Sequence, residues 1–266
     1  MLRRSIRTLT FALGLALALA QPLAGRAVAH PAAPSGAHAL THSSGKIAGP
    51  YVDLTLHQHY ILDTLSAPTR MGMDAQGNLY ISDDSAQKVY MYNSSDSLVR
   101  TFGSGIVGTG NDSFNYPEGV VVTGGVVYVD DYFNGLIQTF NQSSGAFINQ
   151  FSDSHLGNPL GLALGSNGTL YATDDFNNDV VEFSTSGTYL GSFGSTGTGG
   201  GQFVNPRGIA ASPYGPLYVT DATNKNVQEF TLGGGYVTGW GHSSFSGPDG
   251  IAVDRAGMVY VVAVTA

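Results

Sequence analysis

One motif recurs five times and constrains the fold of this chain more than any other feature. It reads Pro, any residue, Gly, two small or apolar residues, a short turn, and then an apolar residue and Tyr shortly before an Asp. The five copies span residues 68–83, 117–131, 159–174, 206–221 and 248–263, with Arg70 replacing the Gly of the first and Ala263 replacing the Asp of the last. Their prolines are 49, 42, 47 and 42 residues apart. A period of roughly 40–50 residues built from short strands predicts a radially repeated β architecture.

Each copy divides into four predicted strands. In the third copy these cover residues 161–164, 170–173, 180–183 and 189–193, and in the fourth copy 208–211, 217–220, 227–230 and 236–240. The first strands are apolar and small on both faces, whereas the later strands alternate apolar and polar residues. This change is expected from the centre to the rim of a propeller blade. We therefore predict an all-β fold, a β-propeller of four-stranded antiparallel blades.

The number of blades depends on the two ends of the repeat region. The last copy ends at Ala266 after its first two strands, and residues 51–56 and 60–65 have the spacing of a third and a fourth strand. Pairing them with residues 250–254 and 259–262 gives a composite fifth blade without exposed strand edges. The alternative is a truncated six-bladed propeller, which the missing Asp of the last copy favours.

The N-terminal region has the pattern of an export signal. A basic start with three arginines precedes an apolar stretch at residues 9–20, and Ala27-Val28-Ala29 offers a cleavage site before His30. The alternative, an uncleaved anchor, conflicts with an apolar run much shorter than the roughly 20 residues that span a bilayer. We predict a signal peptide at 1–29, a flexible linker at 30–50, a propeller at 51–266, and a secreted, periplasmic or cell-envelope location.

Charge and cysteine content narrow the partners. The chain carries a net charge of −8, and the segment after residue 29 holds seven basic and nineteen acidic residues, a net charge of −12. Phosphate backbones and anionic lipid surfaces repel such a chain, so we expect neither nucleic-acid binding nor membrane insertion after signal cleavage. The absence of cysteine excludes disulfides and thiolate chemistry. A bacterial, monomeric protein stabilised by β packing alone is the expectation.

Two of the copies carry a family resemblance. Asn-Pro-Leu-Gly-Leu-Ala at 158–163 with Leu-Tyr-Ala-Thr-Asp at 170–174, and Asn-Pro-Arg-Gly-Ile-Ala at 205–210 with Leu-Tyr-Val-Thr-Asp at 217–221, resemble NHL repeats. The resemblance covers about residues 51–266, with departures at Arg70, Ala86 and Ala263. It implies a propeller, usually six-bladed, that most often serves as a binding module. Relatives include sensor domains of bacterial kinases, RNA- or protein-binding domains, and one enzyme branch, the peptidyl-amidoglycolate lyases.

Two groups of acids recur near the ends of the second strands. The first group precedes a turn, where its carboxylates are expected to accept hydrogen bonds from backbone amides; its members are Asp83, Asp131, Asp174 and Asp221. The second group is expected to face solvent or, alternatively, to line one mouth of the propeller and hold a cation such as calcium; its members are Asp84, Asp130 and Asp175.

The position after each repeat's Pro varies while its surroundings repeat. It lies where the chain enters the innermost strand and is occupied by Thr69, Glu118, Leu160, Arg207 and Asp249. Variable residues on a repeated frame are typical of positions that carry individual chemistry. We predict that four charged residues converge on the channel mouth as a ligand-binding pocket, namely Arg70, Glu118, Arg207 and Asp249. The alternative is a set of salt bridges around the channel.

The sequence gives weaker support for an enzyme. The lyase branch uses a channel metal held by histidines from several inner strands, and here only His155 and His242 lie in loops that lead into first strands. A lactonase-type calcium site built on Glu118 and Asp249 lacks a matching motif. We assign no catalytic residue and expect no cofactor. Calcium or zinc in the central channel is the alternative.

Aromatic residues fall into two sets. A tyrosine recurs at one register of the second strands, which indicates packing between blades; its copies are Tyr80, Tyr128, Tyr171, Tyr218 and Tyr260. Other aromatics lie in or beside turns, where they are suited to stack on sugar rings or to anchor a protein; these are Tyr132, Phe133, Phe176 and Tyr214.

Together these features predict a secreted, non-catalytic recognition or scaffold propeller that binds a protein or a cell-envelope glycan. A metal-dependent lyase or lactonase with its site in the channel is the competing hypothesis. A structural envelope protein is a third.

Overall fold

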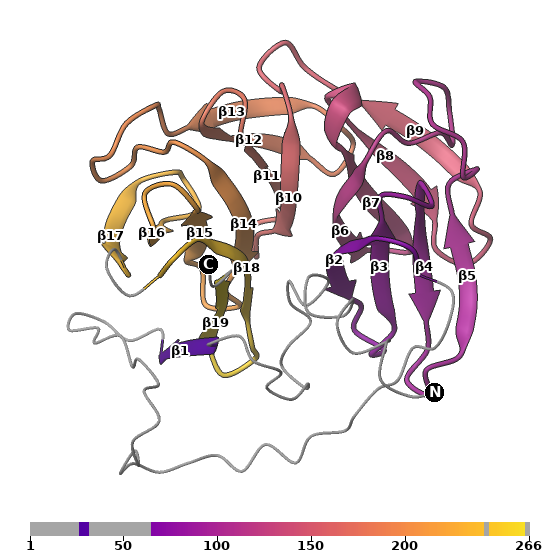
Figure 1. Cartoon of the computed structure of the whole chain (residues 1–266), viewed down its shortest axis with the longest axis horizontal. Coiled ribbons are helices and arrows are strands. Elements are labelled where there is room, and N and C mark those ends of the chain that lie inside the picture. The colour runs from indigo at the N-terminus through magenta and orange to yellow at the C-terminus, as the bar shows by residue number, and fades with distance from the viewer. Residues whose placement is uncertain (1–26, 32–64, 242–244, 264–266) are drawn as a thin grey trace.

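The computed structural model describes the backbone of residues 27–31 and all of residues 65–241 and 245–263 of the 266-residue chain. Four four-stranded antiparallel sheets follow one another, and within each sheet the strands pair in chain order. The sheets stand side by side around a common centre, as blades of a propeller do (Figure 1). The predicted all-β propeller of four-stranded antiparallel blades is confirmed.

The four complete blades have similar strand lengths. Blade 1 contains β2 (Pro68–Met73), β3 (Leu79–Asp83), β4 (Lys88–Tyr92) and β5 (Leu98–Phe102). Blade 2 contains β6 (Pro117–Thr123), β7 (Val126–Asp131), the 3-10 turn η1 (Tyr132–Asn134), β8 (Leu136–Asn141) and β9 (Phe147–Phe151). Blade 3 contains β10 (Pro159–Leu164), β11 (Thr169–Asp174), β12 (Asp179–Ser184) and β13 (Tyr189–Phe193). Blade 4 contains β14 (Pro206–Ala211), β15 (Leu217–Asp221), β16 (Asn226–Phe230) and β17 (Tyr236–Trp240). The strands predicted in the third and fourth copies match these elements to within one or two residues.

A fifth sheet contains β18 (Pro248–Val253), β19 (Met258–Ala263) and β1 (Ala27–Pro31). β1 pairs antiparallel with the outer edge of β19, from Ala27 opposite Val262 to Pro31 opposite Met258. The prediction placed residues 51–56 on that edge, and residues 51–64 lie outside the described part of the chain. β1 also spans the predicted cleavage site after Ala29. An exposed strand edge offers unpaired backbone groups to any extended segment that reaches it.

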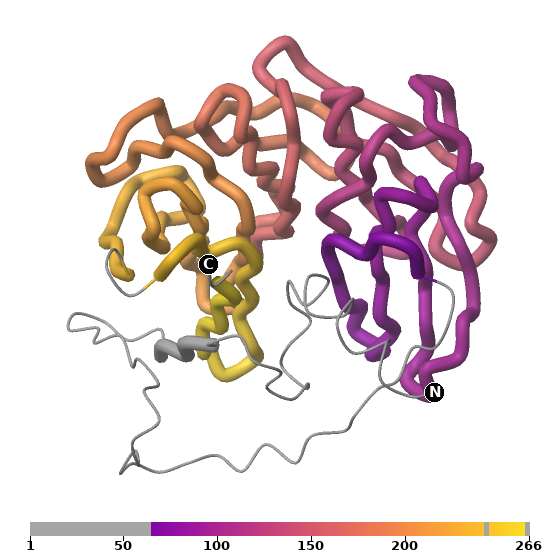
Figure 2. The backbone as a smooth tube through the Cα atoms, in the orientation of Figure 1, coloured from indigo at the N-terminus to yellow at the C-terminus, as the bar shows by residue number. Residues whose placement is uncertain are grey.

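The innermost strands β2, β6, β10, β14 and β18 contact one another in sequence around the centre, and the backbone trace in Figure 2 follows the same course. Neighbouring blades share their cores. One cluster joins Tyr80 and Val89 of blade 1 to Val127 and Phe140 of blade 2. Four such clusters pack each described blade against the next, from blade 1 to the fifth sheet.

The recurrent tyrosines hold this stack together. Tyr128 donates a hydrogen bond of 3.1 Å to the carbonyl oxygen of Thr185 in blade 3, and Tyr171 donates one of 2.6 Å to that of Leu232 in blade 4. Tyr80 is fully buried, and its hydroxyl accepts a 2.8 Å hydrogen bond from the Gln142 side chain of blade 2. The predicted packing between blades is confirmed.

The recurrent aspartates stabilise turns, as predicted. Oδ1 of Asp174 accepts hydrogen bonds from the amides of Phe176 (3.0 Å) and Asn177 (3.1 Å), and Oδ2 accepts one from the Asn177 side chain at 2.9 Å. Asp221 has the same contacts with its own turn. These carboxylates therefore fix the turn between the second and third strands. Within the described residues, no helix has the length and apolar character needed to cross a membrane.

Candidate functional site

A β-bulge opens each inner strand next to its Pro-x-Gly motif. The strand register shifts between Pro117 and Val120 in β6, and equivalent shifts occur in β2, β10, β14 and β18. A bulge changes the direction of the side chains beside it. The variable residue after each proline lies at this bulge. The fold therefore places one variable side chain per blade at the same end of the channel.

The glycine of the motif allows the inner strands to approach closely. A Cβ on Gly161 would lie 2.6 Å from the carbonyl oxygen of Arg207, and a Cβ on Gly208 would lie 2.4 Å from that of Asp249. Blade 1 carries Arg70 at this position. A long cationic side chain thus stands at a position where blades 2, 3 and 4 leave no room for a Cβ.

Arg70 is the centre of an ion-pair network across the ring. Its Nη2 lies 2.7 Å from Oδ1 of Asp249 in β18, and its Nε lies 3.5 Å from Oε2 of Glu118 in β6. Arg207 in β14 places Nη1 3.7 Å from the same Asp249 oxygen. Arg70 is 8% exposed, and the Arg207 side chain is 38% exposed at the outer edge of the network. The four predicted site residues meet, and the salt bridges named as the alternative are present among them.

Four further side chains lie around this network. The Tyr132 hydroxyl donates to the carboxylate of Asp175, with its oxygen 2.9 Å from Oδ2. Thr69 donates a 3.4 Å hydrogen bond to Oδ1 of Asp84. Asp84 and Asp175 are both partly buried. Asp84 and Asp175, from the second group of acids, thus lie near the mouth rather than facing solvent.

Burial raises the pKa of the carboxyl groups at the channel mouth. Desolvation raises the pKa of Glu118 to about 8, although Arg70 opposes the shift. Desolvation also raises the pKa of Asp84 to about 7. Desolvation raises the pKa of Asp175 above its ordinary value, while the hydrogen bond from Tyr132 opposes that shift. Glu118 therefore holds a proton through most of the neutral range.

Asp130 corrects the prediction of a solvent-facing side chain. Its side chain is completely buried on β7, and neither carboxyl oxygen has a hydrogen-bond partner in the described part of the chain. Desolvation raises its pKa well above the ordinary value, and the nearby Glu118 raises it further, against the effect of Arg70. A buried carboxyl group in this setting is neutral rather than ionised.

In blades 3 and 4 a threonine stands at the position equivalent to Asp130. Thr173 donates a 2.6 Å hydrogen bond to the carbonyl oxygen of Arg207, and Thr220 donates one of 2.7 Å to that of Asp249. Each of these hydroxyls joins its blade to the next inner strand. Protonated Asp130 also carries an O–H group, but neither of its oxygens makes the hydrogen bond that Thr173 and Thr220 make.

Unsatisfied polar atoms are concentrated at this mouth. Among the described residues, ten buried side-chain nitrogen or oxygen atoms lack a well-aligned hydrogen bond, and four of them belong to Arg70, Asp130 and Asp249. Such atoms are rare in folded proteins because each one costs free energy. Two of these atoms, Nε of Arg70 and Oδ1 of Asp249, are the ones that form the ion pairs of the network, and the two oxygens of Asp130 are fully buried.

An aromatic group adjoins the network. Phe133 contacts both Tyr116 and Tyr132, with ring centroids 4.8 Å apart in each pair and nearly perpendicular planes. Phe133 is 56% exposed, and Tyr116 lies two residues before Glu118. Of the turn aromatics expected to be exposed, Phe133, Phe176 and Tyr214 are so, whereas Tyr132 is half-buried against Asp175.

The remaining candidates stay apart from the mouth network. His155 pairs with Asp153 and stacks on Tyr189, with ring centroids 4.5 Å apart, and His242 lies outside the described residues. The described residues contain no group of three or more His, Asp or Glu side chains placed to hold a metal ion. The donor set of the described mouth therefore does not fit the channel metal of the enzyme hypothesis.

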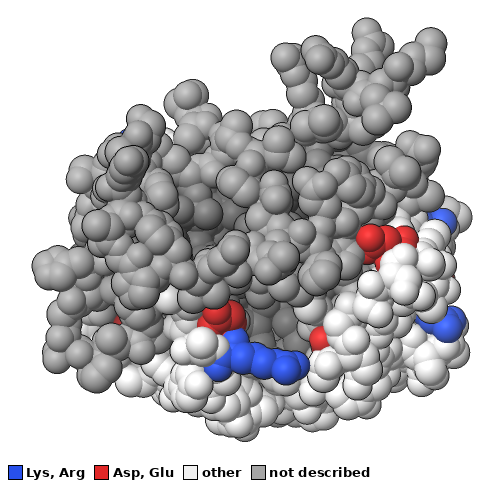
Figure 3. Space-filling model, turned by 90° about the horizontal axis from the view of Figure 1, so that it is seen from below, with Lys and Arg blue, Asp and Glu red and all other residues white. Residues whose placement is uncertain are grey.

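Sequence reasoning missed Tyr116 and the buried state of Asp130. Strand alternation carried the signal for Asp130, because Asp130 lies two residues after Tyr128 and therefore on the same inter-blade face. Charged side chains are sparse on the described surface in Figure 3, and a basic stretch lies directly against acidic atoms there. The ionic groups therefore stand out on a largely uncharged surface.

Comparisons with known proteins identify the fold. Neither the protein-family comparison nor the comparison with curated proteins finds a match. Among solved structures, a streptogramin B lyase has 13% identity and a TM-score of 0.57, with 75% of this chain and 70% of that chain covered. A gluconolactonase from Xanthomonas campestris has 16% identity and a TM-score of 0.59, covering 77% and 74%. Hydrazine synthase of Kuenenia stuttgartiensis has 17% identity and a TM-score of 0.60, covering 80% and 59%. At these identities the likeness shows a shared β-propeller fold.

Proposed function

We propose that the chain is a secreted, NHL-type propeller that acts as a non-catalytic recognition module. Its ligand is a glycan or a protein of the bacterial cell envelope. The site is the channel mouth formed by Arg70, Glu118, Arg207 and Asp249. The export pattern at residues 1–29 and the repeat pattern support the location and the family. N-terminal sequencing of the exported protein tests the predicted cleavage after Ala29.

The meeting of two arginines and two acids at the mouth carries this proposal. Arg70 and Arg207 supply hydrogen-bond donors and Asp249 supplies acceptors, and the side chains of Arg207 and Asp249 remain 38% and 27% exposed. A ligand with donors and acceptors in alternation, such as the hydroxyl groups of a sugar, satisfies atoms of both kinds. Polar groups that converge in a concave site are the usual source of ligand orientation and specificity.

The aromatic group at the rim favours a glycan within this class. Phe133 presents an exposed ring held by Tyr116 and Tyr132, and Tyr132 also contacts the acidic mouth through Asp175. An aromatic ring beside hydrogen-bonding groups combines an apolar face with polar edges, as the two surfaces of a sugar ring require. We therefore expect Phe133 to stack on a sugar held by the ionic network.

A bacterial glycan array tests this proposal with a matched pair of variants. The labelled mature chain is expected to bind a subset of the array, and Phe133→Ala to lose most of that binding. Tyr214→Ala is the control, because Tyr214 is 69% exposed and lies in the turn between β14 and β15, at the opposite end of the inner strands. Equal loss in both variants, or binding by neither the wild type nor the variants, would count against recognition at the mouth.

One observation favours the competing enzymatic function. Glu118 has a pKa raised to about 8 beside the cation of Arg70, and such perturbed groups are typical of acid–base catalysts. The fold neighbours include a streptogramin B lyase and a gluconolactonase. Turnover of a streptogramin B or of gluconolactone by the purified chain, abolished in Glu118→Gln, would support the lyase or lactonase hypothesis over recognition.

A further inference from the structure

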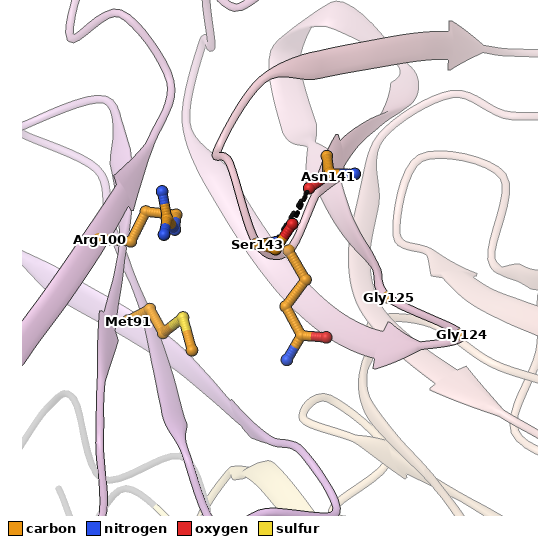
Figure 4. Close-up of a pocket in the computed structure, with 7 residues that line it drawn as sticks. Met91, Arg100, Gly124, Gly125, Asn141 and Ser143 are labelled. Carbon is orange, nitrogen blue, oxygen red and sulfur yellow. Dashed lines mark hydrogen bonds between the residues drawn. The ribbon is translucent and has the colours of Figure 1, made fainter.

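A second polar pocket lies between blades 1 and 2, at the other end of β6 from Glu118. Its volume is about 500 Å³, within the usual range of small-molecule sites, and it is lined by Met91, Arg100, Gly124, Gly125, Asn141, Gln142 and Ser143. In Figure 4, Arg100 and Met91 of blade 1 face Asn141 and Ser143 of blade 2 across open space. Since β6 runs from Pro117 at the mouth to Thr123, this pocket is separate from the proposed binding mouth.

The two hairpins of blade 2 depart from the repeat at this pocket. The inner hairpin joins the first and second strands of each blade. Counted between equivalent strand pairs, it has four residues in blade 2 (123–126) and five residues in blades 1, 3 and 4. The outer hairpin joins the third and fourth strands. It has six residues in blade 2 (141–146) and five residues in blades 1, 3 and 4. A Cβ on Gly124 or Gly125 would meet no atom within 4 Å. The shorter inner hairpin and the longer outer hairpin together create the pocket.

Gln142 is the second departure. At the equivalent positions of blades 3 and 4, the backbone carbonyls of Thr185 and Leu232 accept the tyrosine hydroxyl directly. In blade 2 the side chain of Gln142 makes this contact instead, donating to Tyr80 and to Asp74 at 2.8 Å each. The outer hairpin of blade 2 is thus joined to blade 1 through a side chain rather than through its backbone.

Arg100 is the third departure. It pairs with Met91 in the sheet, and residues at the equivalent position of the other blades are uncharged, namely Asn149, Gly191 and Thr238. Its Nε is buried without a hydrogen-bond partner among the described residues, and no ion pair joins it to a described acid. No acid lines the pocket among the described residues. Asp74 beyond Gln142 already accepts hydrogen bonds from four residues.

The other polar groups of the pocket also favour an acceptor as ligand. Oδ1 of Asn141 accepts hydrogen bonds from the amides of Ser143 (3.0 Å) and Ser144 (2.9 Å) and from the Ser143 hydroxyl (2.8 Å). The Nδ2 group of Asn141 remains as a donor. The pocket therefore combines a guanidinium group, an amide donor and open glycine backbone.

We propose that this pocket binds an oxyanion, a carboxylate or a phosphate monoester carried by a small polar molecule, with Arg100 as its charged anchor. The planar guanidinium fork matches both oxyanions through paired N–H···O hydrogen bonds. Asn141 and the backbone of the Gly124-Gly125 turn hold the polar body of the ligand. The altered hairpin lengths, Gln142 and Arg100 thus all contribute to one anion-binding pocket.

Amide NMR titrations of the labelled full chain with glucuronic acid, glucose 6-phosphate and glucose test this proposal. At least one of the two anions is expected to shift the amide signals of Gly124, Gly125 and Ser143 in a saturable manner, and glucose is not. The tighter of the two anions identifies the carboxylate or the phosphate as the natural group. Arg100→Gln is expected to weaken binding about 10- to 100-fold, the effect of losing a charged hydrogen bond, whereas Arg255→Gln, at an exposed arginine outside both sites, leaves it unchanged.

Arg100→Lys provides a second variant if the glutamine variant does not fold, because it keeps an aliphatic chain beside Gly145, where an added Cβ would lie 3.1 Å from Cδ of Arg100. It is expected to bind the anion more weakly than the wild type, since the ammonium group lacks the planar fork. Anion binding of equal strength in the Arg100 variants, shifts confined to the mouth, or no saturable shift with either anion would overturn the proposal.

Discussion

Arg70 and Asp249 join the first and the last inner strands of the described ring, with Nη2 of Arg70 2.7 Å from Oδ1 of Asp249. One residue belongs to β2 and the other to β18, so they are separated by most of the propeller sequence. Closing a ring of blades requires contacts between its ends. This ion pair supplies such a contact at the same place where the proposed ligand binds.

Arg70→Met is therefore expected to destabilise the fold. It leaves Asp249 without its nearest cation in a partly desolvated site, and breaking a buried pair costs about 3–5 kcal/mol, less here because Asp249 is partly exposed. Urea denaturation measures the loss, and exposed Arg255→Met is the control. A double-mutant cycle with Asp249→Asn isolates the pair. An Arg70→Met variant as stable as the control would show that the pair contributes nothing to closure.

Stability is expected to fall as the pH rises from about 4 to 8. The pKa values of Glu118 and Asp84 are raised to about 8 and 7 by burial, whereas both groups ionise near pH 4 in the unfolded chain. Between these values the folded state binds more protons than the unfolded state, so raising the pH favours unfolding. Thermal melts at pH 5 and pH 8 measure the difference. Glu118→Gln is expected to flatten the dependence, and a protein more stable at pH 8 than at pH 5 would contradict this assignment.

Asp130→Thr is expected to stabilise the protein. It restores the hydroxyl that Thr173 and Thr220 use to bond the next inner strand, and it removes a buried carboxyl group that must stay protonated beside Glu118, Arg70, Asp131 and Asp174. The gain grows with pH, because wild-type Asp130 becomes harder to keep neutral. Melting temperatures across pH 5–9 test this, with Thr173→Asp as the reverse exchange. A destabilised Asp130→Thr at pH 8 would mean that Asp130 is ionised and paired.

Tyr218 reports on the completion of the last blade. Its hydroxyl is buried without a partner among the described residues, whereas Tyr171 in the preceding blade donates to the Leu232 carbonyl of the next outer hairpin. If residues 51–65 supply the outer strands of the last blade, their hairpin reaches Tyr218, and Tyr218→Phe costs about 1 kcal/mol, as Tyr171→Phe does. Urea denaturation of both variants measures this. A neutral or stabilising Tyr218→Phe beside a destabilising Tyr171→Phe would contradict closure by this segment.

Much of the fold follows from local patterns. Strand positions, inter-blade tyrosines and turn aspartates depend on nearest neighbours within one repeat, so each copy reports them independently. The meeting of Arg70, Glu118 and Asp249 was also predictable, because equivalent positions in a ring share one end of the channel. The strength of each contact was not, since it depends on side-chain lengths across the centre.

Features that depend on differences between copies were harder to predict. The outer edge of β19 carries β1 rather than a described partner from residues 51–56, since any extended segment of suitable reach satisfies a strand edge. The pocket at Arg100 of blade 1 arises from one residue lost and one gained in the two hairpins of blade 2. Such a change alters no strand pattern, so it becomes visible only when the blades are compared in space.

The most direct test of recognition at the channel mouth is the affinity of the strongest array ligand for the wild type and for Arg207→Gln, measured by calorimetry. Arg207 lies at the exposed edge of the network, 3.7 Å from Asp249, so its loss alters the site while sparing the buried Arg70 contacts. The account predicts that affinity falls about tenfold or more, the loss of one charged contact, while stability stays near the wild-type value. Unchanged affinity in a folded Arg207→Gln would contradict a binding site at this mouth.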